Sequence, residues 1–376
     1  MRWQNYILHQ DSELARFWKA HLSEKRRNVL FILAKGFDPR MCYGFEMLLQ
    51  AGGDGQRDIF LIQFDEGPTS PSQNYRSWVE HNLQRLQTLI SGRGTLKERP
   101  IQMRSPEGRR IESHSALGMF QNLTEFSDYT DIVLDISAMP RAVYFPLIGK
   151  ILSLVDSARR SQPQEPAPNF HLVIAESPEL DASIREEGVE DDAGYVHPFT
   201  GGLDRESSAH QPKVWLPLLG EGQSIQFQKI HDLITPDEIC PILPSPARNP
   251  RRADELVMQY RDLLFDRLRV EPGNFIYAAE RNPYEVYRQV RNSITDYDRA
   301  LAPLGGSKFV VSALSSKLMS VGALLVAYEL KFENIGVGLA HVACHGYVID
   351  GAPASVPQTE NIELFGLWLA GECDEQ

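Results

Sequence analysis

Short apolar runs alternate with longer segments of helical periodicity along most of the 376 residues, and this alternation restricts the possible folds. Runs rich in Val, Ile, Leu and Phe between helical segments are typical of βα units and of a mostly parallel sheet. In the first half the sequence predicts strands at 28–34, 58–64, 100–103, 131–136 and 169–175. It predicts helices at 41–50, 74–90, 113–126 and 141–155.

The second half repeats this order of elements. Strands are predicted at 213–219, 238–243, 274–279, 308–313 and 337–343. Helices are predicted at 224–234, 252–268, 283–301 and 318–331. Corresponding strands lie about 180 residues apart, and the loops that follow them share their character, which indicates a diverged internal repeat. We therefore expect an α/β fold with two tandem Rossmann-like units, each with a mostly parallel sheet, from an internal duplication.

The loop-rich stretches set the expected boundaries. At roughly 150 residues per domain, each half is long enough to bury its own core. The expected organisation is an N-terminal lead-in helix at 1–27, a first unit at 28–180, an acidic connector at 181–212, a second unit at 213–350 and a C-terminal segment at 351–376. This division leaves no length for an attached catalytic module, so we expect any effector to be a separate protein.

Charge and cysteine usage narrow the class of protein. Lys and Arg total 38 against 50 Asp and Glu, so the net charge of -12 opposes a broad surface that would coat nucleic acid. The most apolar long stretch, 309–328, carries Lys317 near its centre, and the first residues lack the apolar core of a secretion signal. We expect a cytoplasmic protein without membrane spans.

The four scattered cysteines and the pair His341 and His345 match no metal-site spacing, so neither a metal nor a cofactor is expected.

Two corresponding turns after the fourth strand of each half carry the clearest candidate chemistry. They are Asp135-Ile-Ser-Ala-Met-Pro-Arg141 and Val311-Ser-Ala-Leu-Ser-Ser-Lys317. Small side chains let the backbone approach a ligand, and the start of the next helix favours an anion such as phosphate. Ser137, Ser315 and Ser316 would add hydroxyl donors to the cations Arg141 and Lys317. The alternative is a pair of ordinary helix N-caps with a solvated cation.

The turn after the first strand, Lys35-Gly-Phe-Asp-Pro-Arg40, is a second candidate. Gly36 permits a tight bend, and Asp38 before a proline is a helix-start signal. Lys35 and Arg40 would place two cations at the end of the strand. Alternatively, Asp38 caps the next helix and Arg40 pairs with Glu46. The counterpart at 220–224 keeps the glycines but has no cation, which leaves open that the halves differ in function. Neither segment is a dinucleotide-binding or P-loop motif.

The layout and the fourth-strand turns resemble the CARF and SAVED sensor domains. The segment Leu314-Ser-Ser-Lys-Leu-Met319 is similar to the Ser/Thr-rich turn that opens a helix in CARF domains, and 133–141 looks like a weaker version. SAVED domains are similar to two CARF-like units in one chain. The resemblance implies binding of a cyclic oligonucleotide messenger between the units and control of an effector in antiphage defence.

We therefore expect a nucleotide-sensing regulatory protein that binds a nucleotide or other small phosphorylated ligand between two lobes. The residues expected to hold phosphates are Lys35, Arg40, Arg141, Ser315, Ser316 and Lys317. Asp38 and Asp135 would orient the loops or bind a ribose. One alternative is a phosphodiesterase or nucleotide hydrolase in which Asp38 or Asp135 is the base or a metal ligand. The other is a non-catalytic interaction subunit of a multi-protein defence complex. Homo-oligomerisation is left open.

Overall fold

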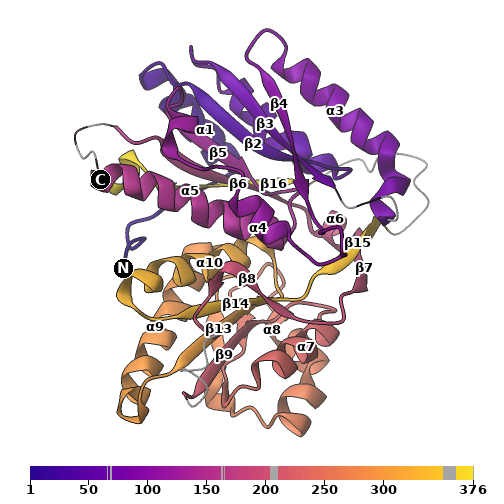
Figure 1. Ribbon diagram of the computed structural model, residues 1–376, viewed down its shortest axis with the longest axis vertical. Helices are drawn as coiled ribbons and strands as arrows, with labels where there is room; N and C mark the ends of the chain where they lie inside the picture. Colours follow the sequence, from indigo (N-terminus) through magenta and orange to yellow (C-terminus); the bar gives the residue numbers. More distant parts are fainter. Residues whose placement is uncertain are drawn as a thin grey trace. The chain divides into compact units, whose positions relative to one another are not determined.

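The computed structural model describes residues 1–65, 67, 70–161, 164, 166–203, 211–349 and 361–375. They form a mixed α/β fold with two large, mostly parallel sheets, which confirms the predicted fold class (Figure 1). The chain divides into two compact units. One unit contains Trp3–Gly188 together with Cys344–Gln376, and the other contains Val189–Ala343. None of the helices in the described ranges is both long and apolar enough to cross a bilayer.

The sheet of the first unit has the strand order β1-β16-β6-β5-β2-β3-β4. These strands are β1 (Ile7–Gln10), β16 (Glu363–Ala370), β6 (Asn169–Glu176), β5 (Asp131–Asp135), β2 (Val29–Lys35), β3 (Arg57–Asp65) and β4 (Leu96–Gln102). The strands from β6 to β4 are parallel. β16, in yellow in Figure 1, is antiparallel to β6 and to β1. The central strands are continuous apolar runs because both of their faces are buried.

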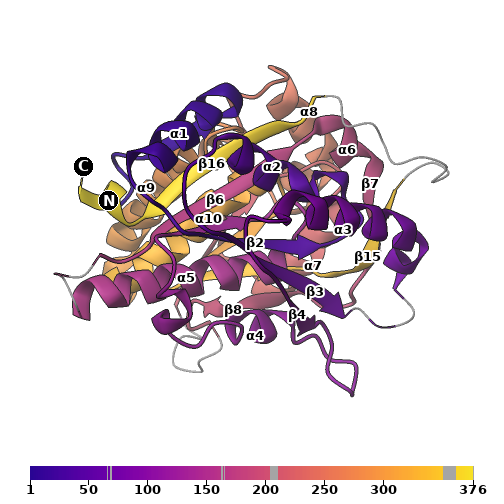
Figure 2. The same ribbon diagram turned by 90° about the horizontal axis from the view of Figure 1, so that it is seen from above.

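Helices cover both faces of this sheet (Figure 2). On one face, α1 (Asp11–Glu24), α2 (Tyr43–Gln50) and α3 (Arg76–Ile90) pack against alternate residues of β2, with Val29, Phe31 and Leu33 in their shared core. On the other face lie α4 (Glu112–Leu117) and α5 (Arg141–Ser161), which contact one another. The short helix α6 (Pro178–Ser183) follows β6.

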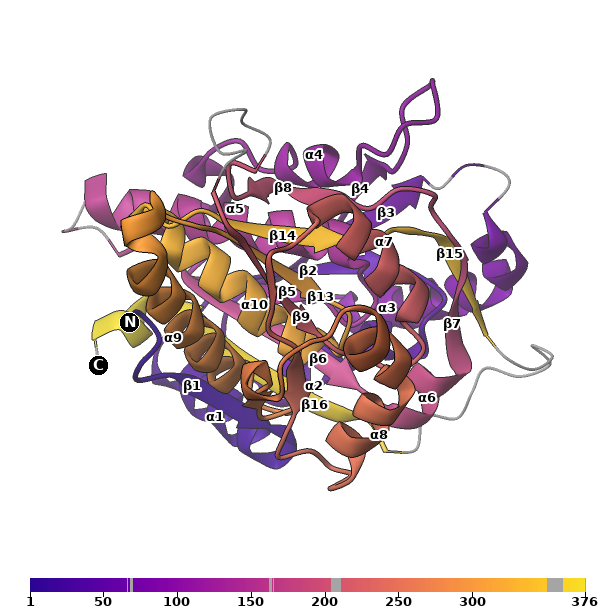
Figure 3. The same ribbon diagram turned by 90° about the horizontal axis from the view of Figure 1, so that it is seen from below.

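The sheet of the second unit has the order β12-β11-β9-β13-β14-β8, and β10 also pairs with β9. Its strands are β12 (Ile276–Ala278), β11 (Ile242–Pro244), β9 (Lys213–Leu218), β13 (Lys308–Ala313), β14 (Val337–His341), β8 (Gly194–Thr200) and β10 (Glu238–Ile239). All pairs are parallel except that of β8 with β14. Its helices are α7 (Ser224–Ile234), α8 (Arg252–Gln259), α9 (Pro283–Leu301) and α10 (Lys317–Leu330). Figure 3 shows α9 and α10 side by side.

The five strands predicted for each half are arranged in the same way. Numbered along each half, they run 3-2-1-4-5 in both sheets, and an antiparallel strand lies beside the fifth. This order matches five of the six strands of the Rossmann order 3-2-1-4-5-6, and the antiparallel strand takes the sixth position. A duplication would produce such a match, but the duplication itself stays a prediction.

The expected boundaries differ from the structure in three places. The lead-in segment 1–27 contains β1 as well as α1, and both belong to the first unit. The expected connector 181–212 contains β7 (Ile184–Val189) and β8 instead of only loop. The expected C-terminal segment 351–376 contributes β16 to the interior of the first sheet, because its apolar run can bury both faces there. Residues 350–360 and 204–210 lie outside the described residues.

Individual elements differ as well. The predicted helix 113–126 is interrupted and forms α4 and a short 3-10 turn at Leu123–Phe126. The predicted helix 252–268 consists of α8 followed by a wider helical segment, Asp262–Arg267. A further strand, β15 (Cys344–Ile349), pairs with β7.

Candidate functional site

In both units the turns after the first and fourth strands meet at the carboxyl edge of the sheet. In the first unit, a Cβ added at Gly36 would lie 3.9 Å from the Cβ of Ala138. In the second unit, a Cβ at Gly220 would lie only 1.8 Å from the carbonyl oxygen of Leu314. Gly220 is therefore required for the close approach of the two backbones. This edge is the topological switch point, where ligands bind in open α/β sheets.

The fourth-strand turn of the second unit is built by its own hydroxyl groups. Ser316 is the N-cap of α10, and its hydroxyl accepts a hydrogen bond of 3.3 Å from the Met319 amide. The Ser315 hydroxyl is buried and donates to the Met319 sulfur. Lys317 is the first residue of α10 and is half-buried. The N-cap interpretation of this turn is thus confirmed for Ser316, and the turn also presents the positive end of the helix dipole.

Charged groups of both signs surround this edge in the second unit. Arg252, at the start of α8, pairs with Glu221 at 3.0 Å and with Glu280 at 2.8 Å. Glu280 also accepts a hydrogen bond from the Arg248 amide. The network connects the turn after β9, which contains Glu221, with the turn after β12, which contains Glu280. It thereby fixes the positions of these two turns at the edge of the sheet.

Arg40 of the first unit is enclosed by carboxylates. Its side chain is 3% exposed and lies 2.7 Å from Asp38 and 2.7 Å from Asp181 in α6. Burial alone would lower the pKa of Arg40, but the charges and hydrogen bonds of Asp38 and Asp181 raise it above its ordinary value. The donors of Arg40 serve this internal ion pair, which argues against its predicted role of holding a ligand phosphate.

Asp38 caps the turn that follows β2, as the alternative interpretation held. Its Oδ1 accepts a hydrogen bond of 2.9 Å from the Arg40 amide. The expected pair of Arg40 with Glu46 does not form, because Glu46 pairs with Arg85. Asp38 is buried and fully occupied with its own turn, which does not suit a catalytic base.

The other predicted residues of the first unit also hold its turns together. Lys35 pairs with Glu98 at 3.1 Å, and Arg141 lies 3.7 Å from Glu186 of β7. The buried Asp135 accepts a hydrogen bond from the Ser137 amide, and the Ser137 hydroxyl accepts one of 2.8 Å from the Ala175 amide. The carboxyl edge of this unit is thus closed by ion pairs and buried hydrogen bonds.

Three of the thiols are poor nucleophiles. Burial raises the pKa of Cys42 to about 12 and the pKa of Cys240 and of Cys344 to about 11. Because the thiolate is the reactive form, these cysteines stay protonated near neutral pH.

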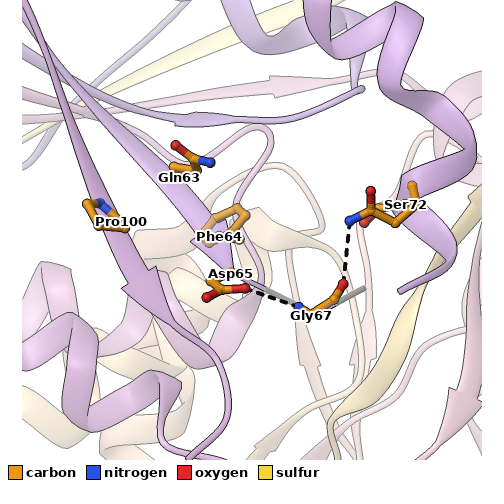
Figure 4. Close-up of a pocket in the computed structure, with 7 residues that line it drawn as sticks. Gln63, Phe64, Asp65, Gly67, Ser72 and Pro100 are labelled. Carbon is orange, nitrogen blue, oxygen red and sulfur yellow. Dashed lines mark hydrogen bonds between the residues drawn. The ribbon is translucent and has the colours of Figure 1, made fainter. Parts of the chain in front are cut away.

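A polar cavity of about 370 Å³ opens elsewhere in the first unit, at the ends of β3 and β4 (Figure 4). Its lining residues are Gln63, Phe64, Asp65, Gly67, Ser72, Gln73 and Pro100. The Asp65 carboxylate accepts a hydrogen bond from the Gly67 amide, and the Gln73 side chain donates to the Gly67 carbonyl. None of the predicted site residues is among these described lining residues.

Three buried side chains meet at the opposite, amino edge of the first sheet, and no sequence motif indicates this group. His21 and His171 both place Nε2 within hydrogen-bond distance of Oδ1 of Asp131, at 2.7 Å and 3.1 Å. Burial raises the pKa of Asp131, but the hydrogen bonds from His171 and His21 outweigh it and keep that pKa well below its ordinary value. The only signal in the sequence is that His171 is a polar residue within the apolar run from Phe170 to Ala175.

The comparisons with known proteins show no family. No protein-family model matches the chain, and no curated protein matches its sequence. Among solved structures, the chain is similar to a universal stress protein from Archaeoglobus fulgidus DSM 4304, at 7% sequence identity and a TM-score of 0.23. The similarity covers 83% of this chain and 94% of that protein. So distant a likeness carries no argument about function.

Proposed function

We propose that this protein binds a small phosphorylated ligand of the nucleotide class at the carboxyl edge of its second sheet and thereby regulates a separate effector. One observation carries the proposal: at the switch point of each Rossmann-like unit, the first-strand and fourth-strand turns are in contact. Ligands of open α/β sheets bind at this position.

The second unit is the better place for the ligand. There, Gly220 allows the two turns to approach, and α10 begins at Lys317 with its N-cap Ser316. The first amides of a helix and its dipole attract an anion, and a lysine at the first position adds a full charge. In the first unit, by contrast, Arg40 is only 3% exposed and lies between Asp38 and Asp181, whereas Lys317 is half-buried.

The acidic groups at the carboxyl edges of the sheets support ligand binding without turnover. The carboxylates of Asp38 and Asp135, which a hydrolase would use as a base, are buried and bonded within their own turns. A net charge of -12 with a few cations at one edge favours a small anion over a long polyanion. A regulatory role is therefore better supported than a hydrolase.

The finer identity of the ligand rests on the resemblance of 314–319 and 133–141 to CARF and SAVED domains. On that basis we propose a cyclic oligonucleotide as the ligand and antiphage defence as the setting. The proposal of a phosphorylated ligand at Lys317 stands without this extension.

Titration calorimetry with the full chain tests the proposal. The panel contains ATP, a cyclic mononucleotide, cyclic oligonucleotides and inorganic phosphate. At least one nucleotide should bind, and Lys317→Ala should weaken its binding at least about tenfold, which corresponds to about 1.4 kcal/mol. Lys331→Ala is the matched control, because Lys331 is an exposed lysine at the other end of α10 and should leave binding unchanged.

Two outcomes would contradict the proposal. One is that no nucleotide of the panel binds, and the other is that Lys317→Ala binds as tightly as the wild type. Chromatography of the same mixtures with Mg²⁺ distinguishes a sensor from an enzyme, because a sensor leaves the nucleotide intact and an enzyme forms a product.

A further inference from the structure

Three side chains with metal-binding atoms meet in the interior of the first unit. His21 lies near the end of α1, Asp131 begins β5, and His171 lies in β6. One nitrogen of each imidazole and one oxygen of the carboxylate all lie within 4.8 Å of one another. The three residues are 6%, 0% and 2% exposed, so the cluster is closed to bulk solvent.

We propose that His21, Asp131 and His171 bind one divalent transition-metal ion of the zinc class through the two Nε2 atoms and Oδ1. Two imidazoles with one carboxylate are a donor set for such ions, whereas Mg²⁺ and Ca²⁺ prefer oxygen ligands only. This proposal is independent of the proposed nucleotide site, because it concerns the amino edge of the other sheet.

The distances between the ligand atoms require only a small adjustment. With metal–ligand distances of about 2.0–2.1 Å, the ligands of a tetrahedral ion lie about 3.3–3.4 Å apart. The two Nε2 atoms lie 2.7 Å and 3.1 Å from Oδ1. Moving each nitrogen away from Oδ1 by under about 1 Å would therefore bring both of these pairs to the spacing of ligands on one ion.

The carboxylate is already oriented by its neighbours. The Thr130 hydroxyl donates to Oδ2 of Asp131 at 2.7 Å, and the side-chain amide of Asn169 donates to Oδ1 at 3.0 Å. Hydrogen bonds of this kind fix the geometry of ligating carboxylates in metal sites. Arg27 lies 3.6 Å from Oδ2, and its charge is shared with Glu372 at 2.9 Å, so Asp131 is not its only counter-charge.

The imidazole rings are held by aromatic side chains. The ring centroid of Trp18 lies 4.8 Å from that of His171, and the ring centroid of Trp368 lies 5.0 Å from that of His21. These contacts fix the ring orientations. One enclosed water molecule would supply the fourth ligand of a tetrahedral ion. A bound ion would thus join α1 to β5 and β6 and have a structural role.

Metal analysis of the full chain tests the proposal. After chelator treatment and addition of Co²⁺, the wild type should show the visible d–d absorption of a tetrahedral site, and Zn²⁺ should abolish that absorption at one equivalent. Mass spectrometry of the Zn²⁺-loaded protein should give one ion per chain, and Zn²⁺ should raise the melting temperature.

Variants separate a metal site from a hydrogen-bonded cluster. In His21→Gln and His171→Gln the amide can still donate to Asp131 but is a poor zinc ligand, so each should lower Zn²⁺ affinity at least about tenfold. His81→Gln, at an exposed position of α3, is the control and should not change it. The proposal is overturned if the wild type shows neither the Co²⁺ absorption nor bound Zn²⁺. It is equally overturned if both glutamine variants bind Zn²⁺ as the wild type does.

Discussion

Arg40 holds the first-strand turn together from inside. Two nitrogens of its guanidinium contact the Asp38 carboxylate, and a third contacts Asp181. Asn82 adds hydrogen bonds from its side chain to the carbonyl oxygens of Gly36 and Asp38. The turn is therefore preorganised by a buried cation that connects β2 with α6.

The first prediction concerns this cation. Arg40→Ala leaves the buried Asp38 carboxylate without its counter-charge, so the free energy of unfolding should fall by about 3–5 kcal/mol. Arg85→Ala removes the ion pair with Glu46, whose two side chains are about one-third exposed. It should lower the free energy of unfolding by about 1 kcal/mol or less. Urea denaturation of both variants measures the difference. Equal losses would show that Arg40 is no more than a surface cation.

The second prediction concerns Gly44 in the first turn of α2. A Cβ there would lie 2.6 Å from Oδ2 of Asp135 and 2.8 Å from Cγ1 of Val173. Although alanine favours a helix, Gly44→Ala should lower the free energy of unfolding by about 1–3 kcal/mol because of this overlap. Gly118→Ala is the control, since its nearest neighbour would be at 3.5 Å and its stability should change by under about 1 kcal/mol. If Gly44→Ala left the free energy of unfolding unchanged, that result would contradict the close packing of Asp135 on α2.

At the scale of elements, β16 completes the first sheet from the far end of the chain. It lies between β1 and β6, and its residues from Leu364 to Ala370 are buried. Without it, β6 would lose its antiparallel neighbour, and β1 would lose its partner in the sheet.

The third prediction follows from that position. Deletion of 361–376 should abolish cooperative unfolding of the first unit, because an interior strand and its apolar side chains are lost. Deletion of 374–376 keeps β16 and should leave the fold intact. Circular dichroism during denaturation and limited proteolysis distinguish the two. A protease-resistant first unit in the longer deletion would contradict the prediction.

The strands that the sequence predicted best are the central ones. β2, β5, β9 and β13 are buried on both faces, so each is a continuous apolar run that local pattern reveals. The edge strand β4 is mostly exposed and carries Lys97, Glu98 and Arg99, so its first half lacks the apolar pattern that predicts a strand. The sequence does not predict β7 and β16, because neither strand belongs to the regular alternation of strands and helices from which the central strands are predicted.

The site was less predictable than the fold, for a physical reason. That Asp38 and Ser316 cap helices depends on local sequence, which offers capping as the alternative to ligand binding at both turns. That Arg40 meets Asp181, or that His21 meets His171, depends on elements more than 100 residues apart in the chain. A local sequence pattern cannot predict contacts between such distant residues.

At the scale of the whole molecule, charge pairs link the chain's two terminal regions. Glu372 accepts hydrogen bonds from Arg27 at 2.9 Å and from Lys25 at 2.8 Å. The hydrogen bond from Arg27, together with that from Lys25 and the charges of both, lowers the pKa of Glu372 from its ordinary value of 4.5 to about 2. Because the folded protein binds the proton less tightly, this carboxylate stabilises the fold above about pH 4.5, and the contribution is lost as the pH falls toward about 2.

The fourth prediction applies this linkage. At pH 7, Glu372→Gln should lower the free energy of unfolding by about 1 kcal/mol, a value reduced for the partial exposure of the side chain. The difference from the wild type should shrink steadily below about pH 4.5. Urea denaturation across this range measures it, with Glu13→Gln, in an exposed pair, as the control for loss of a surface charge. A difference that stays constant down to about pH 3 would contradict the assignment.

The interior position of β16 also governs the order in which the chain can fold during synthesis. A ribosome releases the whole of 189–343 before it releases 363–370. The nascent second unit can therefore close its sheet while the first still lacks a strand, although the first began to emerge earlier. The half of the protein that is made first is finished last.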